Sequence, residues 1–160
     1  MRIATIAALL AACASQPKPA SDSLDAVARD YVALTLEIGE REPAGRARAA
    51  RIVAMVLQFG EKNPGMARVM VGDALVFEHQ RLQQRMNQFF DKLDAALRQS
   101  LRDGALADSA EPATLTPDAD ARVRASVLTA FVAGRLQRFA RSGFRRAPSE
   151  QLGACIARML

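Results

Sequence analysis

Besides its carboxylates, the chain holds one histidine and two cysteines as the side chains most suited to acid–base or metal chemistry. Its only histidine, His79, directly follows Glu78 and lies six positions after Asp73. An imidazole and two carboxylates can bind a metal, but ligands on one helix must share a face, as in an HExxH motif. These three residues do not have that spacing, and one histidine cannot support several catalytic sets. The sequence therefore predicts no enzyme, no metal site and no cofactor.

The two cysteines, Cys13 and Cys155, are too few for a disulfide framework and lack CxxC spacing. Cys155 is expected to be a small core or interface residue. Cys13 ends the letters LAAC, after a positive start and the apolar residues 3–12. This order resembles the lipobox of bacterial lipoproteins, in which the cysteine is acylated. Residues 1–21 are therefore expected to be a lipoprotein signal and tether, or else a remnant N-terminus.

A basic cluster is the strongest charge signal, in a chain of net charge +5. No acid lies between Ala121 and Arg146. Such a cluster could contact phosphates or an acidic tail. It could equally be a solvated face whose cations complement a helix C-terminus. Aromatic residues for base stacking are sparse, which favours the solvated face. The cluster consists of Arg135, Arg138, Arg141, Arg145 and Arg146.

The elements that must position these residues are predicted to be helices. Half of the residues are hydrophobic, only 5% are aromatic, and apolar positions recur every three or four residues. The sequence predicts one all-α domain over residues 22–160, with a flexible linker at 103–115. The expected helices cover residues 24–38, 46–61, 64–71, 74–102 and 116–142, with a short one after Ser149.

The last two predicted helices carry much apolar surface for a small domain. Large apolar residues stand beside the small Ala133 and Gly134, which permit close helix approach. The large residues can form the core of one chain or complete their burial in a partner. The candidate dimer-interface residues are Leu128, Phe131, Val132, Leu136, Phe139, Leu152 and Ile156.

One run of sequence resembles a known family. FGEKNPG, starting at Phe59, is followed by GDALVFEHQRLQQRMNQFF. Residues 46–144 resemble the C-terminal domain of the SlmA-type nucleoid occlusion factors, in the TetR superfamily. The resemblance implies a helical ligand and dimerisation domain in which the last two long helices pack against their symmetry mates. The partner would be a second copy or an intact homologue.

The resemblance also implies a peptide site. In the family, a hydrophobic and basic groove holds the acidic C-terminal tail of FtsZ, the division tubulin. Carried across, Met55 would supply apolar contact, Gln58 would replace a family glycine, and Lys62 with Asn63 would hold the peptide. On the other wall, where the family has an aromatic residue and an arginine, this sequence has Ala26 and Leu34.

Three hypotheses follow for the whole chain. The first is a truncated division regulator, cytoplasmic and nucleoid-associated through its partners, whose expected helix-turn-helix is absent; direct DNA binding is then not expected from this chain alone. The second is a lipoprotein module anchored in the bacterial envelope through Cys13, the only route to a membrane. The third is a composite reading frame joined near residues 40–45.

Overall fold

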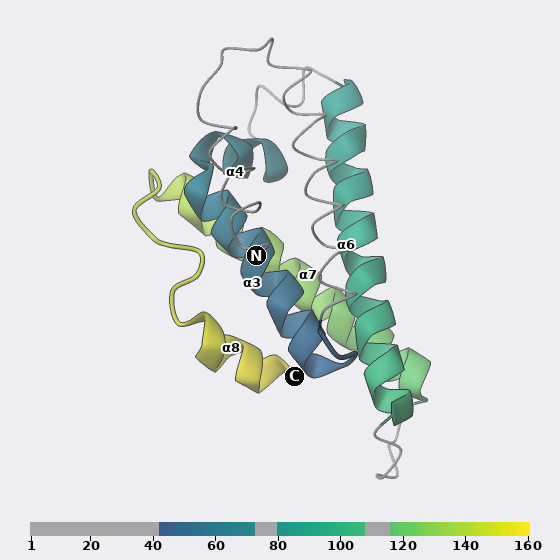
Figure 1. The fold of residues 1–160 in the computed structure, drawn as a ribbon. Helices are drawn as coiled ribbons and strands as arrows, with labels where there is room; N and C mark the ends of the chain where they lie inside the picture. The colour runs from purple at the N-terminus through teal and green to yellow at the C-terminus, as the bar shows by residue number, and fades with distance from the viewer. Residues whose placement is uncertain (1–41, 73–79, 108–115) are drawn as a thin grey trace, which may run out of the picture.

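The computed structural model describes residues 42–72, 80–107 and 116–160, and the regular structure in these ranges is helical. This confirms the all-α prediction. The helix expected over residues 24–38 lies outside the described ranges, as do Cys13 and His79. The helices are α3 (Arg46–Lys62), α4 (Pro64–Met70), α6 (Gln80–Ala107), α7 (Pro117–Arg141) and α8 (Leu152–Met159) (Figure 1).

Local signals in the sequence set where the helices begin and end. Thr116 caps α7, because its hydroxyl oxygen accepts a hydrogen bond from the Ala119 N–H at 3.3 Å. Pro117 follows at the first helical position, and Asp118 and Asp120 lie at the positive end of the helix dipole. Arginines occupy the last turn of the same helix. The helix α7 therefore has one acidic and one basic end.

The helix α7 is the centre of the domain. It packs most extensively on α6, and α3 and α4 cover another side of it (Figure 1). Their apolar faces meet in one core, as the helical periodicity predicts. The largest fully buried side chains of this core are Ile52, Val53, Val56 and Leu57 of α3, Leu97 of α6, and Leu128, Val132 and Leu136 of α7.

A contact between two glycines joins the start of α3 to the end of α6. Gly45 has φ +108°, which favours glycine, and its N–H donates to the Ser100 carbonyl at 2.8 Å. A Cβ at Gly104 would overlap the Gly45 Cα. Residues 103–107, expected to belong to a linker, form the last turns of α6, and residues 108–115 lie outside the described ranges. The apolar periodicity ends at Leu101, but Gly104 still packs closely against Gly45.

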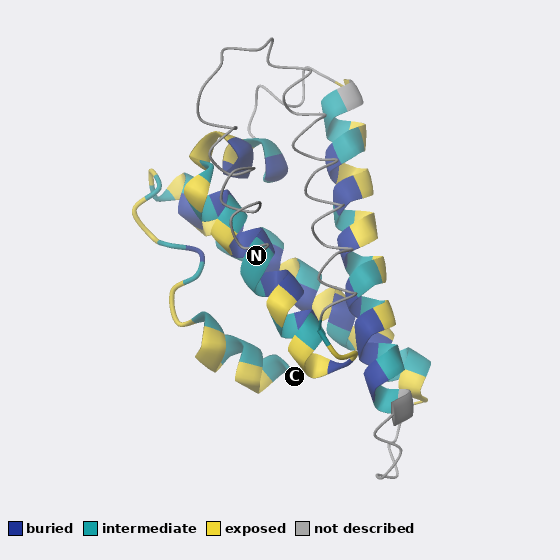
Figure 2. Ribbon diagram, in the orientation of Figure 1, coloured by how far each residue is buried: buried dark blue, intermediate teal, exposed yellow. Residues whose placement is uncertain are grey.

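The last helix, α8, is the least buried element. It has no buried residue, although Leu152, Ile156 and Met159 pack against the edge of the core (Figure 2). No side chain caps its start, and Gln151 precedes it in a left-handed conformation, with φ 54°. In the described ranges, no helix has the length and hydropathy that crossing a bilayer requires.

Candidate functional site

The outer face of α3 carries three of the four residues expected to bind a peptide. Met55, Gln58 and Lys62 are spaced by three and four residues, so they share one side of the helix. That side is opposite the buried residues Val53, Leu57 and Gly60. Met55 is half-buried, whereas Gln58 and Lys62 are exposed. The structure therefore places an apolar group, an amide and a cation along one accessible stripe.

Asn63 lies where α3 ends and α4 begins. Its backbone N–H and its Nδ2 both donate to the Phe59 carbonyl, at 3.0 Å and 2.9 Å. The side chain therefore caps the end of α3 and does not cap the start of α4. These bonds fix the orientation of the amide and leave its oxygen and one N–H for another partner. The facing wall, where the sequence has Ala26 and Leu34, lies outside the described residues.

Four of the residues expected at a dimer interface belong to the core of the single chain. Leu128, Val132, Leu136 and Phe139 are buried inside the single chain, against α3, α4 and α6. The period of apolar residues marks a buried face, but it does not say whether the same chain or another one covers it. Phe131, Leu152 and Ile156 are only partly buried and remain near the surface.

A different stripe of α7 faces outward. Val123 and Val127 are 55% and 48% exposed, and they are the exposed large hydrophobic residues of the described chain. Ala130 and Gly134 continue the stripe at helical spacing and are also exposed. A Cβ at Gly134 would meet no atom within 4 Å. The sequence signal for this face was a second set of small and apolar residues, recurring every three or four positions.

The structure divides the basic cluster into two parts. Arg135 belongs to the packing of α8: its Nη2 lies 3.0 Å from the Cys155 Sγ, and its guanidinium lies over the Phe131 ring at 4.9 Å. Arg138, Arg141, Arg145 and Arg146 are exposed at the end of α7 and in the turn after it. Cys155 is only partly buried, so it is an edge residue held by Arg135.

Two long-range hydrogen bonds were not foreseen. The Ser149 hydroxyl donates to the Glu61 carboxylate, which ties the segment before α8 to the end of α3. Arg124 donates to the Leu160 carbonyl at 2.8 Å and so holds the end of α8 to α7. The two residues of each pair are far apart in sequence, so no local sequence pattern predicts either bond. In the described ranges, no three histidine, cysteine or acidic side chains gather where they could hold a metal ion.

The all-α arrangement, with a long α6–α7 pair and an outward face on α7, is consistent with a TetR-like C-terminal domain. The family model described as "Tetracyclin repressor-like, C-terminal domain", in its SlmA-like form, matches residues 45–157. The chain belongs to this SlmA-like family. The match begins at residue 45, close to the start of the described structure at residue 42, and it does not favour the membrane-anchored alternative.

Particular relatives share this part of the chain. The nucleoid occlusion factor SlmA of Cronobacter sakazakii is 44% identical over 115 residues, which are 72% of this chain and 54% of that protein. The SlmA proteins of Citrobacter koseri and Klebsiella pneumoniae are each 44% identical over 108 residues, or 68% of this chain and 52% of theirs. The chain thus spans about half the length of the curated relatives it matches.

Proposed function

We propose that this chain is a cell-division regulator of the nucleoid occlusion type. Its helical domain would pair with a second copy and bind the acidic C-terminal tail of the division protein FtsZ. The observation that carries the proposal is the end of α3, where the exposed Lys62 stands beside the partly buried, fixed amide of Asn63. The relatives, which are named as nucleoid occlusion factors, support the regulatory role. A regulator of this kind would act in the cytoplasm, near the nucleoid.

The chemistry of the α3 face fits an acidic peptide. The ammonium group of Lys62 can pair with a carboxylate, and its position in the last turn of α3 also suits the helix dipole. Asn63 can exchange hydrogen bonds with the peptide backbone through its free oxygen and N–H. Met55 gives the peptide an apolar contact, seven residues before the cation on the same face. Gln58 adds a polar contact between them.

The outward stripe of α7 fits a second copy of the chain. If two α7 helices pack antiparallel, Val123 of one copy faces Gly134 of the other when Val127 faces Ala130. Both pairs belong to one register, so a large residue meets a small one at every step, as a self-complementary interface requires. Phe131, Leu152 and Ile156 would border this contact. An intact homologue with the same stripe could replace the second copy.

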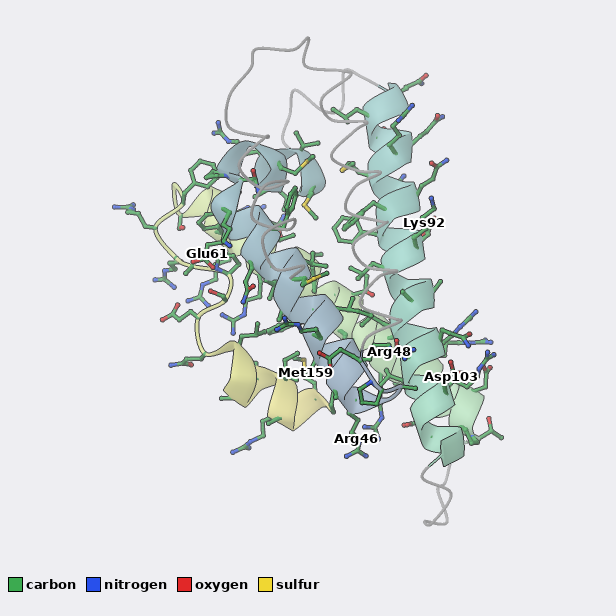
Figure 3. All side chains as sticks on the ribbon, in the orientation of Figure 1. Arg46, Arg48, Glu61, Lys92, Asp103 and Met159 are labelled. Carbon is green, nitrogen blue, oxygen red and sulfur yellow. The ribbon has the colours of Figure 1, made fainter. Side chains whose placement is uncertain are left out.

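The peptide site can be tested by fluorescence anisotropy with a labelled peptide of the FtsZ C-terminal tail. Lys62→Gln is expected to weaken binding about fivefold, which corresponds to about 1 kcal/mol for one exposed ion pair. Lys92→Gln is the matched control. Lys92 is an exposed lysine on α6, far from the end of α3 that Glu61 marks (Figure 3).

Two results would reject the peptide site: no binding of the peptide to the unchanged protein, or equal weakening by the two lysine variants. Equal weakening would mean that binding depends on the net charge of the protein and not on the position of Lys62. Met55→Ala should also weaken binding, because it removes the apolar contact without changing the charge.

A further inference from the structure

Basic residues from two helices and a turn gather at one end of the molecule. At this end α3 stops, α4 lies across, and α7 ends (Figure 1). Arg68 of α4 reaches the turn after α7, since its guanidinium lies over the Phe144 ring at 5.6 Å. We call this surface the basic end. Its cations are Arg68, Arg138, Arg141, Arg145 and Arg146, all exposed.

Within the described ranges, no carboxylate forms an ion pair with the arginines at the end of α7 and in its turn, Arg138, Arg141, Arg145 and Arg146. The ion pairs found there are Arg102–Asp103, Arg122–Asp118 and Arg124–Asp120, on α6 and in the first turns of α7. The nearby described acids are Glu61, which is hydrogen-bonded to Ser149 and keeps its negative charge, and Glu150. The four arginines at the end of α7 and in its turn outnumber these two carboxylates, so positive charge is in excess among the described residues there.

The turn that follows α7 holds its arginines in a fixed position. The Ser142 hydroxyl oxygen accepts from the N–H groups of Arg145 and Arg146, at 3.1 Å and 3.0 Å. Phe144 has φ 64° and packs edge-on against the buried Phe139, with ring centroids 5.1 Å apart. A surface whose backbone is already ordered loses less conformational entropy when it binds.

Helix capping accounts for only one of these cations. Arg145 donates from Nε to the Ser142 carbonyl at 3.0 Å, so it serves the end of α7. In the described structure, the guanidinium groups of Arg138, Arg141 and Arg146 make no hydrogen bond or ion pair with another residue. A guanidinium group offers a planar fork of donors that matches a phosphate.

We propose that the basic end binds the phosphate backbone of double-stranded nucleic acid, without reading its sequence. The described large hydrophobic residues that are exposed, Val123 and Val127, lie on the first half of α7 and not here. Among the described residues, the basic end therefore has no exposed large apolar side chain to insert into a lipid layer. Its aromatic ring, Phe144, is partly buried against Phe139 rather than open for base stacking, so contacts to the backbone are what this surface can make.

The test is the binding of a fluorescein-labelled DNA duplex of scrambled sequence, measured by anisotropy at several salt concentrations. The variant Arg138→Gln, Arg141→Gln, Arg146→Gln should bind at least about tenfold more weakly at low salt. Removing one phosphate-binding cation lowers the slope of log K against log salt by about 0.9, so the slope should fall by up to about 2.7. These substitutions are on the surface, and circular dichroism would verify the fold.

The matched control is Arg51→Gln, Arg122→Gln, Arg158→Gln, which removes the same charge from exposed positions on α3, α7 and α8. This variant should keep most of the affinity and of the slope. Equal weakening in the two variants would overturn the proposal, because binding would then follow net charge alone. Failure of the unchanged protein to bind the duplex at low salt would also overturn it. Binding to vesicles containing phosphatidylglycerol but not to the duplex would reassign the surface to membranes.

Discussion

The close contact between Gly45 and Gly104 joins the start of α3 to the last turns of α6, and it is possible because Gly104 has no Cβ. A Cβ on Gly104 would overlap the Gly45 Cα and lie 2.9 Å from its nitrogen. Both of these are backbone atoms, which cannot move aside by rotation as a side chain can. The Gly45 N–H is also bonded to Ser100, so that segment is held from two directions.

Gly104→Ala should therefore destabilise the domain by about 1–3 kcal/mol, in spite of the better helix propensity of alanine. Gly65→Ala is the control, since a Cβ at Gly65 meets no atom within 4 Å. It should change stability by less than about 0.5 kcal/mol, within the range of surface substitutions. Urea unfolding followed by circular dichroism measures both changes. If Gly104→Ala were as stable as the unchanged protein, the close packing would not hold in solution.

At the scale of elements, α8 depends on a few side chains rather than on a buried face. Arg124 holds its last carbonyl and Arg135 contacts Cys155, while none of its residues is buried. Elements with few buried contacts open most readily, and their amides exchange first. Hydrogen exchange should therefore be faster in α8 than in α3 or α7.

Arg135→Gln should raise exchange in α8 further, because it removes the contacts to Cys155 and to the Phe131 ring. The core of α7, around Leu128 and Val132, should keep its protection. Arg122→Gln, which alters an exposed arginine on the same helix, is the control and should leave α8 unchanged. Equal exchange in the two variants would show that Arg135 does not hold α8.

The sequence predicts these elements well where their signals are local. Thr116 and Pro117 mark the start of α7, and the period of the apolar residues identifies the faces that form the core. The candidate site is harder to predict. The sequence identifies Asn63 as a capping residue, but it does not show that the side chain bonds back to the end of α3. Likewise, the pairs Glu61–Ser149 and Arg124–Leu160 join distant parts of the chain. Only the folded backbone brings such residues together.

For the whole molecule, we propose that the outward stripe of α7 is the surface through which copies associate. Val127→Glu should convert a dimer into a monomer, because pairing would bury a carboxylate without a partner. Ala95→Glu places the same charge on the exposed side of α6 and should leave the dimer intact. Light scattering after size-exclusion chromatography distinguishes the two masses. A monomeric unchanged protein, or a dimeric Val127→Glu variant, would exclude this face as the interface.

The polarity of α7, acidic in its first turn and basic in its last, has a consequence for such a pair. In an antiparallel dimer the charge polarity of one α7 opposes that of the other, and the two basic ends lie at opposite extremities of the particle. Two basic ends on one particle make it bivalent toward a long polyanion. The second attachment is then intramolecular, so avidity exceeds the affinity of either end alone. A mixed dimer with one neutralised basic end would therefore lose far more than half of its residence time on the polyanion.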